Sequence, residues 1–314
     1  MHEHESFNPD LMCALGGIVG EDDVLMVEPM KLHTTFRIGG PADLLVRPHS
    51  PEELVRVLDT CTFADVPVTI VGNGSDLLVG DRGIRGVVVL LRDTMQAISV
   101  SGTRVTAEAG ALLRDVALAA ADAGLSGMEP LWGIPATVGG ACFMNAGAYG
   151  GQTADVLESV EVYVPSKRGQ RGSVCTLEAD QLAFGYRKSR INSDGLVVLR
   201  ATFALAPDSP DAIRFAMDDF QARREEKQPL EMPSAGSTFK RPEGYFAGKL
   251  IMDAGLRGAS VGAAQVSQKH CGFVVNTGGA TAADVCGLIE HIQTEVKRQF
   301  GVDLEPEVRR IGEF

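Results

Sequence analysis

Residues 71–89 read VGNGSDLLVGDRGIRGVVV. The apolar, β-branched run VTIVG that leads into them predicts a buried strand, and GVVVLL at 86–91 repeats that pattern. Between the two strands, glycines allow a tight turn whose backbone N–H groups can point at an anion. GNGSDLL at 72–78 is therefore either a phosphate-binding loop or an ordinary turn. It is not the dinucleotide-binding fingerprint, because Leu77 stands where the third glycine belongs.

A helix precedes this loop. Ser50 as N-cap and Glu53 three residues later predict a capping box at the start of SPEELVRVLDTC (50–61), so the chain opens as a β-α-β-like unit. The same reasoning predicts these further elements: a hairpin at 97–110, a helix at 112–124, a hairpin at 157–164 and 172–177, a strand at 195–205 and a helix at 207–227.

The C-terminal hundred residues mix short strands with one clear helix. That helix begins at Thr281, with Asp284 completing a capping box, and ends at Gly301. Its apolar residues recur on one face, which is typical of a helix packed on a sheet. VDLEPEVRRI at 302–311 is predicted as the closing strand.

Composition bounds the possible functions. The 314 residues are too many for one ordinary core, and a net charge of −12 disfavours nucleic acid as a partner. No apolar run approaches the roughly 20 residues that cross a bilayer, and the N-terminus lacks the pattern of a secretion signal. Six scattered cysteines without a C-x-x-C pair indicate a reducing compartment and no metal site. We therefore expect a cytoplasmic protein that binds neither membrane nor metal.

A second glycine-rich segment, WGIPATVGGACFMNAGAYGG at 132–151, is harder to explain as a turn. Val138, Cys142, Phe143 and Met144 are apolar enough to be buried. A buried segment rich in glycine suggests a backbone that lies against a flat or charged ligand. We expect a ligand contact here.

The stretch PSAGSTFKRP (233–242) encloses Ser237 between two prolines. Ala235 and Phe239 occupy the glycine positions of a G-x-S-x-G nucleophile elbow, and Lys240 follows the serine where a P-loop lysine would precede its hydroxyl residue. A nucleophile and a phosphate ligand of these known kinds are therefore excluded. Gly236 would allow a close approach to Ser237.

Several motifs in order resemble the UDP-N-acetylenolpyruvoylglucosamine reductase family, flavoenzymes of bacterial peptidoglycan synthesis. The resemblance extends from about residue 28 to the C-terminus and rests on these segments: TTFRIGGPADLLVRP (34–48), VGNGSDLLVGDRGIRGVVV (71–89), GIPATVGGACFMNAGAYG (133–150), FGYRKSRI (184–191), SAGSTFKRP (234–242), QVSQKHCGFVVN (265–276) and LEPEVRRIG (304–312).

The resemblance implies an α+β protein with an FAD-binding fold of the vanillyl-alcohol-oxidase type in two subdomains, 1–96 and 97–208, and a smaller substrate-binding domain, 209–314. FAD and NADPH would be the cofactors and UDP-N-acetylglucosamine enolpyruvate the substrate, with the chain a monomer. The residues implied to bind FAD are Arg37, Gly72, Asn73, Gly74, Ser75, Asp76, Gly133, Ile134, Pro135, Thr137, Val138, Gly139, Gly140, Asn145, Gly147 and Ala148.

Three residues match the family's catalytic positions: Arg187, Ser237 and Glu307. Hydride transfer to the enolpyruvyl group leaves carbanion character beside a carboxylate. The guanidinium of Arg187 can bind that carboxylate and stabilise the growing negative charge. Glu307 would assist if it is held protonated, or else it forms a salt bridge to a neighbouring arginine. Ser237 would protonate the carbanion, with Lys240 or Arg241 supporting the alkoxide. The implied substrate-binding residues are Tyr186, Lys249, Gln265, Ser267 and His270.

One branch of the family carries an extra loop with a tyrosine that closes over the substrate. No tyrosine occurs between Lys188 and Gly236, so this chain resembles the branch without that loop. Two other functions remain open at this point: an FAD-linked oxidase acting on a hydroxy acid or alcohol, and a nucleotide-binding regulatory domain. The oxidase is disfavoured because GNGSD offers no histidine for covalent flavin attachment.

Overall fold

The computed structural model describes residues 9–167 and 169–314, so the polar N-terminal residues 1–8 lie outside it. The chain forms two compact units that interleave along the sequence. The first unit comprises Met1–Met26, Leu44–Asn73 and Gly86–Ala222, and the second Val27–Asp43, Gly74–Arg85 and Arg223–Phe314. These boundaries differ from the expected 1–96, 97–208 and 209–314, so the three-part division stays a prediction about domains.

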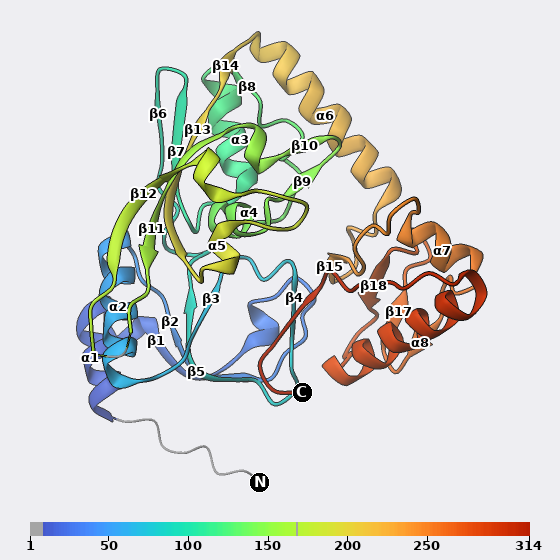
Figure 1. The fold of residues 1–314 in the computed structure, drawn as a ribbon, viewed down its shortest axis with the longest axis horizontal. Coiled ribbons are helices and arrows are strands. Elements are labelled where there is room, and N and C mark those ends of the chain that lie inside the picture. The colour runs from blue at the N-terminus through green and yellow to red at the C-terminus, as the bar shows by residue number, and fades with distance from the viewer. Residues whose placement is uncertain (1–8, 168) are drawn as a thin grey trace. The chain divides into compact units, whose positions relative to one another are not determined.

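The first unit is built on a five-stranded antiparallel sheet in the order β12-β11-β13-β7-β6 (Figure 1). Its strands are β6 (Ile98–Ser101), β7 (Arg104–Glu108), β11 (Leu157–Val164), β12 (Ser173–Glu178) and β13 (Val197–Ala204). Both predicted hairpins are confirmed, since β6 pairs with β7 and β11 with β12. Four short strands accompany the sheet: β8 (Leu125–Ser126), β9 (Gly147–Ala148), β10 (Gly151–Gln152) and β14 (Ala206–Pro207).

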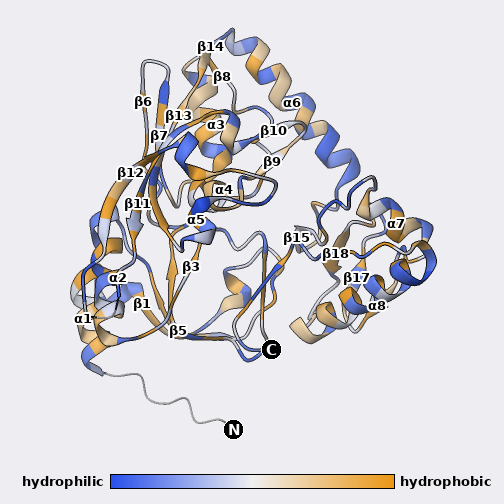
Figure 2. Ribbon diagram, viewed as in Figure 1, coloured by the Kyte–Doolittle hydropathy of each residue, from blue (hydrophilic) through white to orange (hydrophobic). Residues whose placement is uncertain are grey.

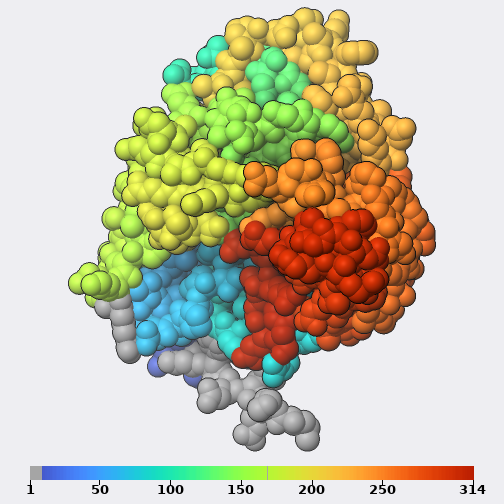
Figure 3. All heavy atoms as spheres, turned by 45° about the vertical axis from the view of Figure 1, so that its right-hand side comes forward, coloured from blue at the N-terminus to red at the C-terminus, as the bar shows by residue number. Residues whose placement is uncertain are grey.

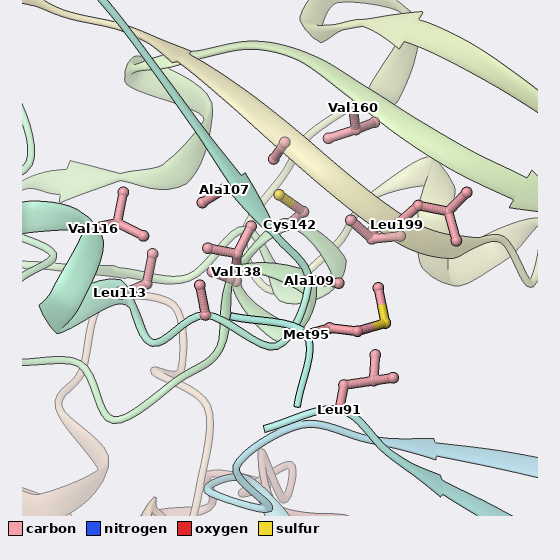
Figure 4. Close-up of a cluster of buried hydrophobic side chains, with 14 of the residues drawn as sticks. Leu91, Met95, Ala107, Ala109, Leu113, Val116, Val138, Cys142, Val160 and Leu199 are labelled. Atoms are coloured by element: carbon pink, nitrogen blue, oxygen red, sulfur yellow. The ribbon is translucent and has the colours of Figure 1, made fainter. Parts of the chain in front are cut away.

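Helices α3 (Leu113–Asp122) and α4 (Val138–Met144) contribute to the core of this unit. Figure 4 shows Val138 and Cys142 of α4 directed into the same cluster as Ala107 and Leu199 of the sheet. The composition of the glycine-rich segment gave no sign of α4. Its Thr137 caps the helix and its apolar face is fully buried, which outweighs the poor helix propensity of Gly139 and Gly140.

A four-stranded sheet in the order β1-β2-β5-β3 contains β3, the strand that leads into the loop at 72–76, and β5, which follows that loop and β4. Its strands are β1 (Val24–Pro29), β2 (Pro41–Val46), β3 (Val68–Val71) and β5 (Ile84–Leu90), and β3 runs parallel to β5. Helices α1 (Pro9–Val19) and α2 (Pro51–Ala64) accompany it. Ser50 caps α2, but Glu53 accepts the backbone N–H of His49, so the predicted capping box is shifted by one residue.

The second unit is built on a four-stranded antiparallel sheet in the order β15-β18-β17-β16. Its strands are β15 (Ser234–Ser237), β16 (Ser260–Val261), β17 (Ala264–Val266) and β18 (Phe273–Asn276), with helices α7 (Ala247–Asp253) and α8 (Ala282–Phe300). Hydrophobic and hydrophilic residues alternate around α8 (Figure 2), and its apolar face is buried. The capping box of Thr281 and Asp284 is confirmed, as is the end of the helix at Gly301.

The closing strand is shorter than predicted. Only β19 (Arg309–Ile311) is a strand, and it pairs in parallel with β4 (Leu77–Val79). Pro306 lies within the expected strand, and a proline cannot donate to a ladder. In Figure 3 the orange and red residues of this unit form one continuous surface.

Two further α-helices are α5 (Arg190–Ser193) in the first unit, and α6 (Pro210–Lys227), within which the chain passes from the first unit to the second. Short 3-10 helices lie at Glu21–Asp23, Met30–Leu32, Thr153–Asp155 and Ala179–Leu182. No helix among residues 9–167 and 169–314 has the length and apolarity that a membrane span requires.

Candidate active site

The loop at 72–76 begins in the first unit, where protein contacts account for its first glycine. A Cβ added to Gly72 would lie 2.2 Å from the hydroxyl oxygen of Thr137, which is too close for any other residue. The side-chain amide of Asn73 donates to the carbonyl of Pro135 at 2.6 Å. The start of the loop is therefore held against the segment that leads into α4.

The same loop continues in the second unit with its carbonyls turned into the protein. Gly74 has a φ of +60°, and its carbonyl accepts the N–H of Thr35 at 3.3 Å. The carbonyl of Asp76 accepts the N–H of Arg309 at 2.9 Å. Within the described part of the chain, the N–H groups of Gly74 and Ser75 have no protein acceptor. Backbone donors left open in this way fit a diphosphate such as that of FAD.

Thr35 belongs to a segment whose residues alternate between buried and outward positions. Phe36 and Ile38 are 1% and 2% exposed, whereas Arg37 between them is exposed and has a φ of +54°. This left-handed conformation costs a non-glycine residue about 1–3 kcal/mol and is concentrated at functional sites. It presents Arg37 on the surface of the second unit, next to the residues that contact Gly74.

The first turn of α4 has its backbone donors already occupied. The N–H groups of Val138 and Gly139 donate to protein carbonyls, that of Gly139 to Ala109 at 2.9 Å, and the N–H of Gly140 donates to the Thr137 hydroxyl. A Cβ on Gly139 would lie 3.2 Å from the Cβ of Ala109. Packing within the protein therefore explains part of the glycine content that we attributed to a ligand, and Gly140 is the residue of this turn with an open face.

The other expected cofactor residues of this segment lie in turns and short strands. Gly133 and Ile134 lie in the turn before α4, where the N–H of Ile134 donates to Leu131. Gly147 and Ala148 form β9, and a Cβ on Gly147 would lie 2.6 Å from a carbonyl oxygen of β10.

Arg187 lies at the tip of a tight turn in the first unit. Gly185 and Lys188 exchange two backbone hydrogen bonds, of 2.9 and 3.2 Å, which leave Tyr186 and Arg187 at the end of the turn. Arg187 has a φ of +55°, another left-handed non-glycine residue. Its guanidinium carbon lies 5.0 Å from the centroid of the Tyr186 ring, and that ring is 58% exposed.

This turn is fastened to the C-terminal end of α4. The buried amide of Asn145 donates to the carbonyl of Gly185 at 3.2 Å, and the hydroxyl of Ser189 donates to the carbonyl of Phe143 at 2.7 Å. The amide of Asn145 also bonds to Gln152, and its oxygen accepts a backbone N–H. Since the side chain of Asn145 is fully used inside the protein, a contact of this residue with a cofactor would come from its backbone.

Ser237 lies at a β-bulge. Three steps along β15, from Ser234 to Ser237, face only two steps along β18. In a regular strand Ser237 would share a face with Ala235, which is 3% exposed and part of the core. The extra residue, Gly236 with a φ of +74°, turns Ser237 to the exposed side instead.

The segment that follows Ser237 runs beside the one that holds Glu307. The carbonyl of Thr238 accepts the N–H of Glu307 at 2.8 Å, and Phe239 and Pro306 form an antiparallel bridge. Thr238 itself is anchored to β18, where its hydroxyl accepts the N–H of Val274 at 3.0 Å. The structure therefore brings two of the three expected catalytic residues onto adjacent backbone segments.

The positive charges near Ser237 have other partners. The ammonium of Lys240 is paired with the carboxylate of Glu305, and the guanidinium of Arg241 lies 4.0 Å from the centroid of the Phe246 ring. We expected one of these cations to support an alkoxide at Ser237. The pair with Glu305 already neutralises Lys240, which argues against that role for the lysine.

Of the expected substrate residues in the second unit, His270 is the most constrained. The hydroxyl of the buried Ser267 accepts the N–H of His270, and Nδ1 of His270 accepts the N–H of Gly272 at 3.0 Å. Burial, and then the charge of Arg257, lower the pKa of His270 below its usual value. A neutral ring that accepts at Nδ1 carries its proton on Nε2, so His270 is a donor without charge.

Lys249 and Gln265 lie on surface positions of the same unit. Lys249 is exposed on α7, where its ammonium pairs with Asp253 at 2.8 Å. Gln265 is half-buried on β17, opposite Val275 of β18.

Hydrogen bonds of the second unit form a closed circuit that joins the loop at 72–76 to the segments that carry Ser237 and Glu307. Gly74 is bonded to Thr35, and the hydroxyl of Thr35 donates to the carbonyl of Ser234 at 2.7 Å. β15 leads to Ser237 and Thr238, and the carbonyl of Thr238 accepts the N–H of Glu307. Two residues further on, the N–H of Arg309 donates to the carbonyl of Asp76, which closes the circuit at the cofactor loop. Sequence reasoning missed Thr35, because its partner lies 199 positions away and no local pattern points to it.

Two family models match the chain. Residues 42–169 match the FAD binding domain, and residues 228–311 match the UDP-N-acetylenolpyruvoylglucosamine reductase C-terminal domain. Together with the open backbone donors of the loop, these matches define an FAD-dependent oxidoreductase. Alkyldihydroxyacetonephosphate synthase shares the fold, with a TM-score of 0.50 over 64% of this chain and 40% of that one at 18% identity.

More similar relatives narrow this class. A UDP-N-acetylenolpyruvoylglucosamine reductase of Agathobacter rectalis is 53% identical over 93% of this chain and 95% of the relative, and one of Clostridioides difficile is 48% identical over 98% and 99%. The crystal structure of the reductase of Thermus caldophilus covers 92% of this chain and 98% of its own, with a TM-score of 0.77 and 38% identity. The chain belongs to the UDP-N-acetylenolpyruvoylglucosamine reductase family, and the fold predicted from its sequence is confirmed.

Proposed function

We propose that the chain reduces UDP-N-acetylglucosamine enolpyruvate to UDP-N-acetylmuramate with NADPH as the source of electrons, and that it does so in the cytoplasm as a monomer. Family membership supports the substrate class. The observation that carries the assignment of residues is the closed hydrogen-bond circuit that joins Gly74, Ser237 and Glu307 in one unit.

The candidate FAD-binding residues fall into two groups. Gly74 and Ser75 offer backbone donors to the diphosphate, Asp76 follows them in the same loop, and Arg37 lies on the adjoining segment. The expected contacts of the first unit run from Gly133 to Ala148, and among them Gly140 has an open face. FAD held by these residues would, once reduced, supply a hydride for the terminal carbon of the enolpyruvyl group.

The chain's own residues then stabilise and protonate the product of that transfer. Arg187, presented by its left-handed turn, grips the substrate carboxylate as negative charge grows on the adjacent carbon. Glu307 lies on the segment beside Thr238 and would assist by donating a hydrogen bond if its carboxyl is held protonated. Ser237, turned outward by the bulge, gives its proton to the adjacent carbon. One hydride and one proton are thereby added across the double bond.

The remaining residues bind the nucleotide sugar. Tyr186 offers an exposed ring beside Arg187, and Lys249 and Gln265 offer polar groups on the second unit. His270 donates through Nε2, while Ser267 holds its turn. We also propose that the chain belongs to the family branch without the tyrosine loop.

Isotope labelling tests this function. The protein, loaded with FAD, is supplied with deuterated NADPH and the enolpyruvyl substrate in ordinary water, and then with ordinary NADPH in deuterium oxide. We expect solvent deuterium on the adjacent carbon in the second case, and on the terminal carbon in the first case the NADPH deuterium that has not exchanged from the flavin N–H into water, as seen by mass spectrometry and NMR of UDP-N-acetylmuramate. A protein that takes up no FAD, or whose reduced flavin is reoxidised by oxygen but not by the substrate, would contradict the proposal.

A further inference from the structure

We infer that Thr35 is a positioning residue that holds the strand of Ser237 in register with the cofactor loop, an inference that rests on the proposed function. Thr35 makes one hydrogen bond to each of the two segments. Its backbone N–H donates to Gly74 at 3.3 Å, and its side-chain hydroxyl donates to the carbonyl of Ser234 at 2.7 Å.

The bond to Ser234 is the link of the circuit that depends on a side chain. The other links, from Glu307 to Thr238, from Arg309 to Asp76 and from Thr35 to Gly74, are bonds between backbone groups. Backbone links persist whatever the side chains are, whereas the hydroxyl of Thr35 can be removed by a single substitution. The identity of residue 35 therefore controls whether the circuit is closed.

The place where the hydroxyl attaches makes its effect specific. Ser234 is the first residue of β15 and pairs with Val275 of β18, directly before the register shift that ends at Ser237. A strand can pair with its neighbour with the extra residue of a bulge or without it. The two pairings differ by one residue in register, which moves each side chain beyond the bulge to the other face of the sheet. A fixed carbonyl at Ser234 leaves the extra residue at Gly236, which is the arrangement that exposes Ser237.

A second link supports the same segment. The side-chain amide of Asn276, 5% exposed at the end of β18, donates to the carbonyl of Phe36 at 3.1 Å, and its backbone N–H donates to the carbonyl of Pro233 at 2.9 Å. The segment that contains Thr35 is thus bonded to β15 and to β18 on the same side of the bulge, at Ser234 and at Asn276. This bracing explains why loss of one hydroxyl is expected to loosen the Ser237 strand without unfolding the unit.

The test compares Thr35→Val, which keeps the shape but removes the donor, with Thr35→Ser, which keeps the donor. Thr277→Val is the matched control, because the hydroxyl of Thr277 also donates to a backbone carbonyl in the same unit, that of Ala263 at 2.9 Å. In the protein without FAD, hydrogen exchange of the peptide covering 233–238 should be faster in Thr35→Val and unchanged in Thr35→Ser and Thr277→Val.

With FAD bound, stopped-flow absorbance separates the two halves of the reaction. We expect Thr35→Val to be reduced by NADPH at the wild-type rate and reoxidised by saturating enolpyruvyl substrate at least ~10-fold more slowly, within the ~10² that misplacement by about 1 Å can cost. Thr35→Ser should restore reoxidation. Wild-type reoxidation in Thr35→Val, an equal defect in Thr35→Ser, or loss of FAD from Thr35→Val would each overturn the inference. Failure of the substrate to reoxidise the wild-type protein would instead overturn the proposed function.

Discussion

Replacement of Gly236 by alanine tests the bulge that exposes Ser237. Gly236 has a φ of +74°, and a Cβ added there meets no protein atom within 4 Å. The cost of Gly236→Ala is therefore conformational and contains no clash with the described chain. A left-handed L-residue costs about 1–2 kcal/mol, so the free energy of unfolding should fall by that amount.

The functional effect should exceed this modest loss of stability. A strand can relieve the strain by giving up the bulge, which would return Ser237 to the buried face that Ala235 occupies. Reoxidation of the reduced flavin by substrate should then slow by ~10² or more, because the serine no longer faces the reacting carbon. Reduction by NADPH should be unchanged.

Gly244 provides a matched control. Its φ is +75°, and a Cβ there likewise meets no protein atom within 4 Å, but it lies outside β15. Chemical denaturation should show equal losses for Gly236→Ala and Gly244→Ala, whereas stopped-flow reoxidation should be slow only in Gly236→Ala. Equal reoxidation in the two variants would refute the role of the bulge. Slowing of both half-reactions would show instead that Gly236 is needed for a close approach of the cofactor.

Two further predictions concern titratable groups. Because burial lowers the pKa of His270 in the folded state, the unfolded chain binds more protons near and below pH 6.5, the ordinary value for histidine. The free energy of unfolding should therefore decline as pH falls below about 6.5, and this decline should be smaller in His270→Gln. Identical pH profiles of the free energy of unfolding in the two proteins would contradict this prediction. Burial also raises the pKa of Cys142 to about 12. A thiol reagent at pH 8 should therefore modify the exposed Cys13 and Cys175 quickly, but Cys142 only after unfolding. Rapid labelling of Cys142 in the double variant Cys13→Ser, Cys175→Ser would contradict its burial.

Local patterns predicted the elements whose stability is local. The helix from Thr281 begins at its capping box and buries the predicted face, since both features depend on residues within a few turns of each other. The hairpin at 97–110 formed for the same reason. Local pattern failed at 302–311, where pairing is limited to Arg309–Ile311 by the position of β4.

The candidate site depends on contacts that no local pattern encodes. Glycines suggested a ligand at the 72–78 loop and in the segment around α4, but Gly72 of the first and Gly139 of the second are also required by contacts with Thr137 and Ala109. The motif around Ser237 predicted it as a candidate, but the bulge that turns it outward exists only in the pairing of β15 with β18. The sequence therefore predicts candidate residues, and long-range pairing determines how they are presented.

Proton donation by Ser237 is the central claim of the mechanism, and single-turnover reoxidation of Ser237→Ala measures it most directly. The variant is loaded with FAD, reduced anaerobically with NADPH and mixed with the enolpyruvyl substrate, with Ser260→Ala of β16, at the other edge of the same sheet, as control. Reduction should proceed at the wild-type rate, and reoxidation should slow by the ~10²–10⁴ that a positioned acid contributes, while Ser260→Ala behaves as wild type. Reoxidation of Ser237→Ala at the wild-type rate would show that another group supplies the proton.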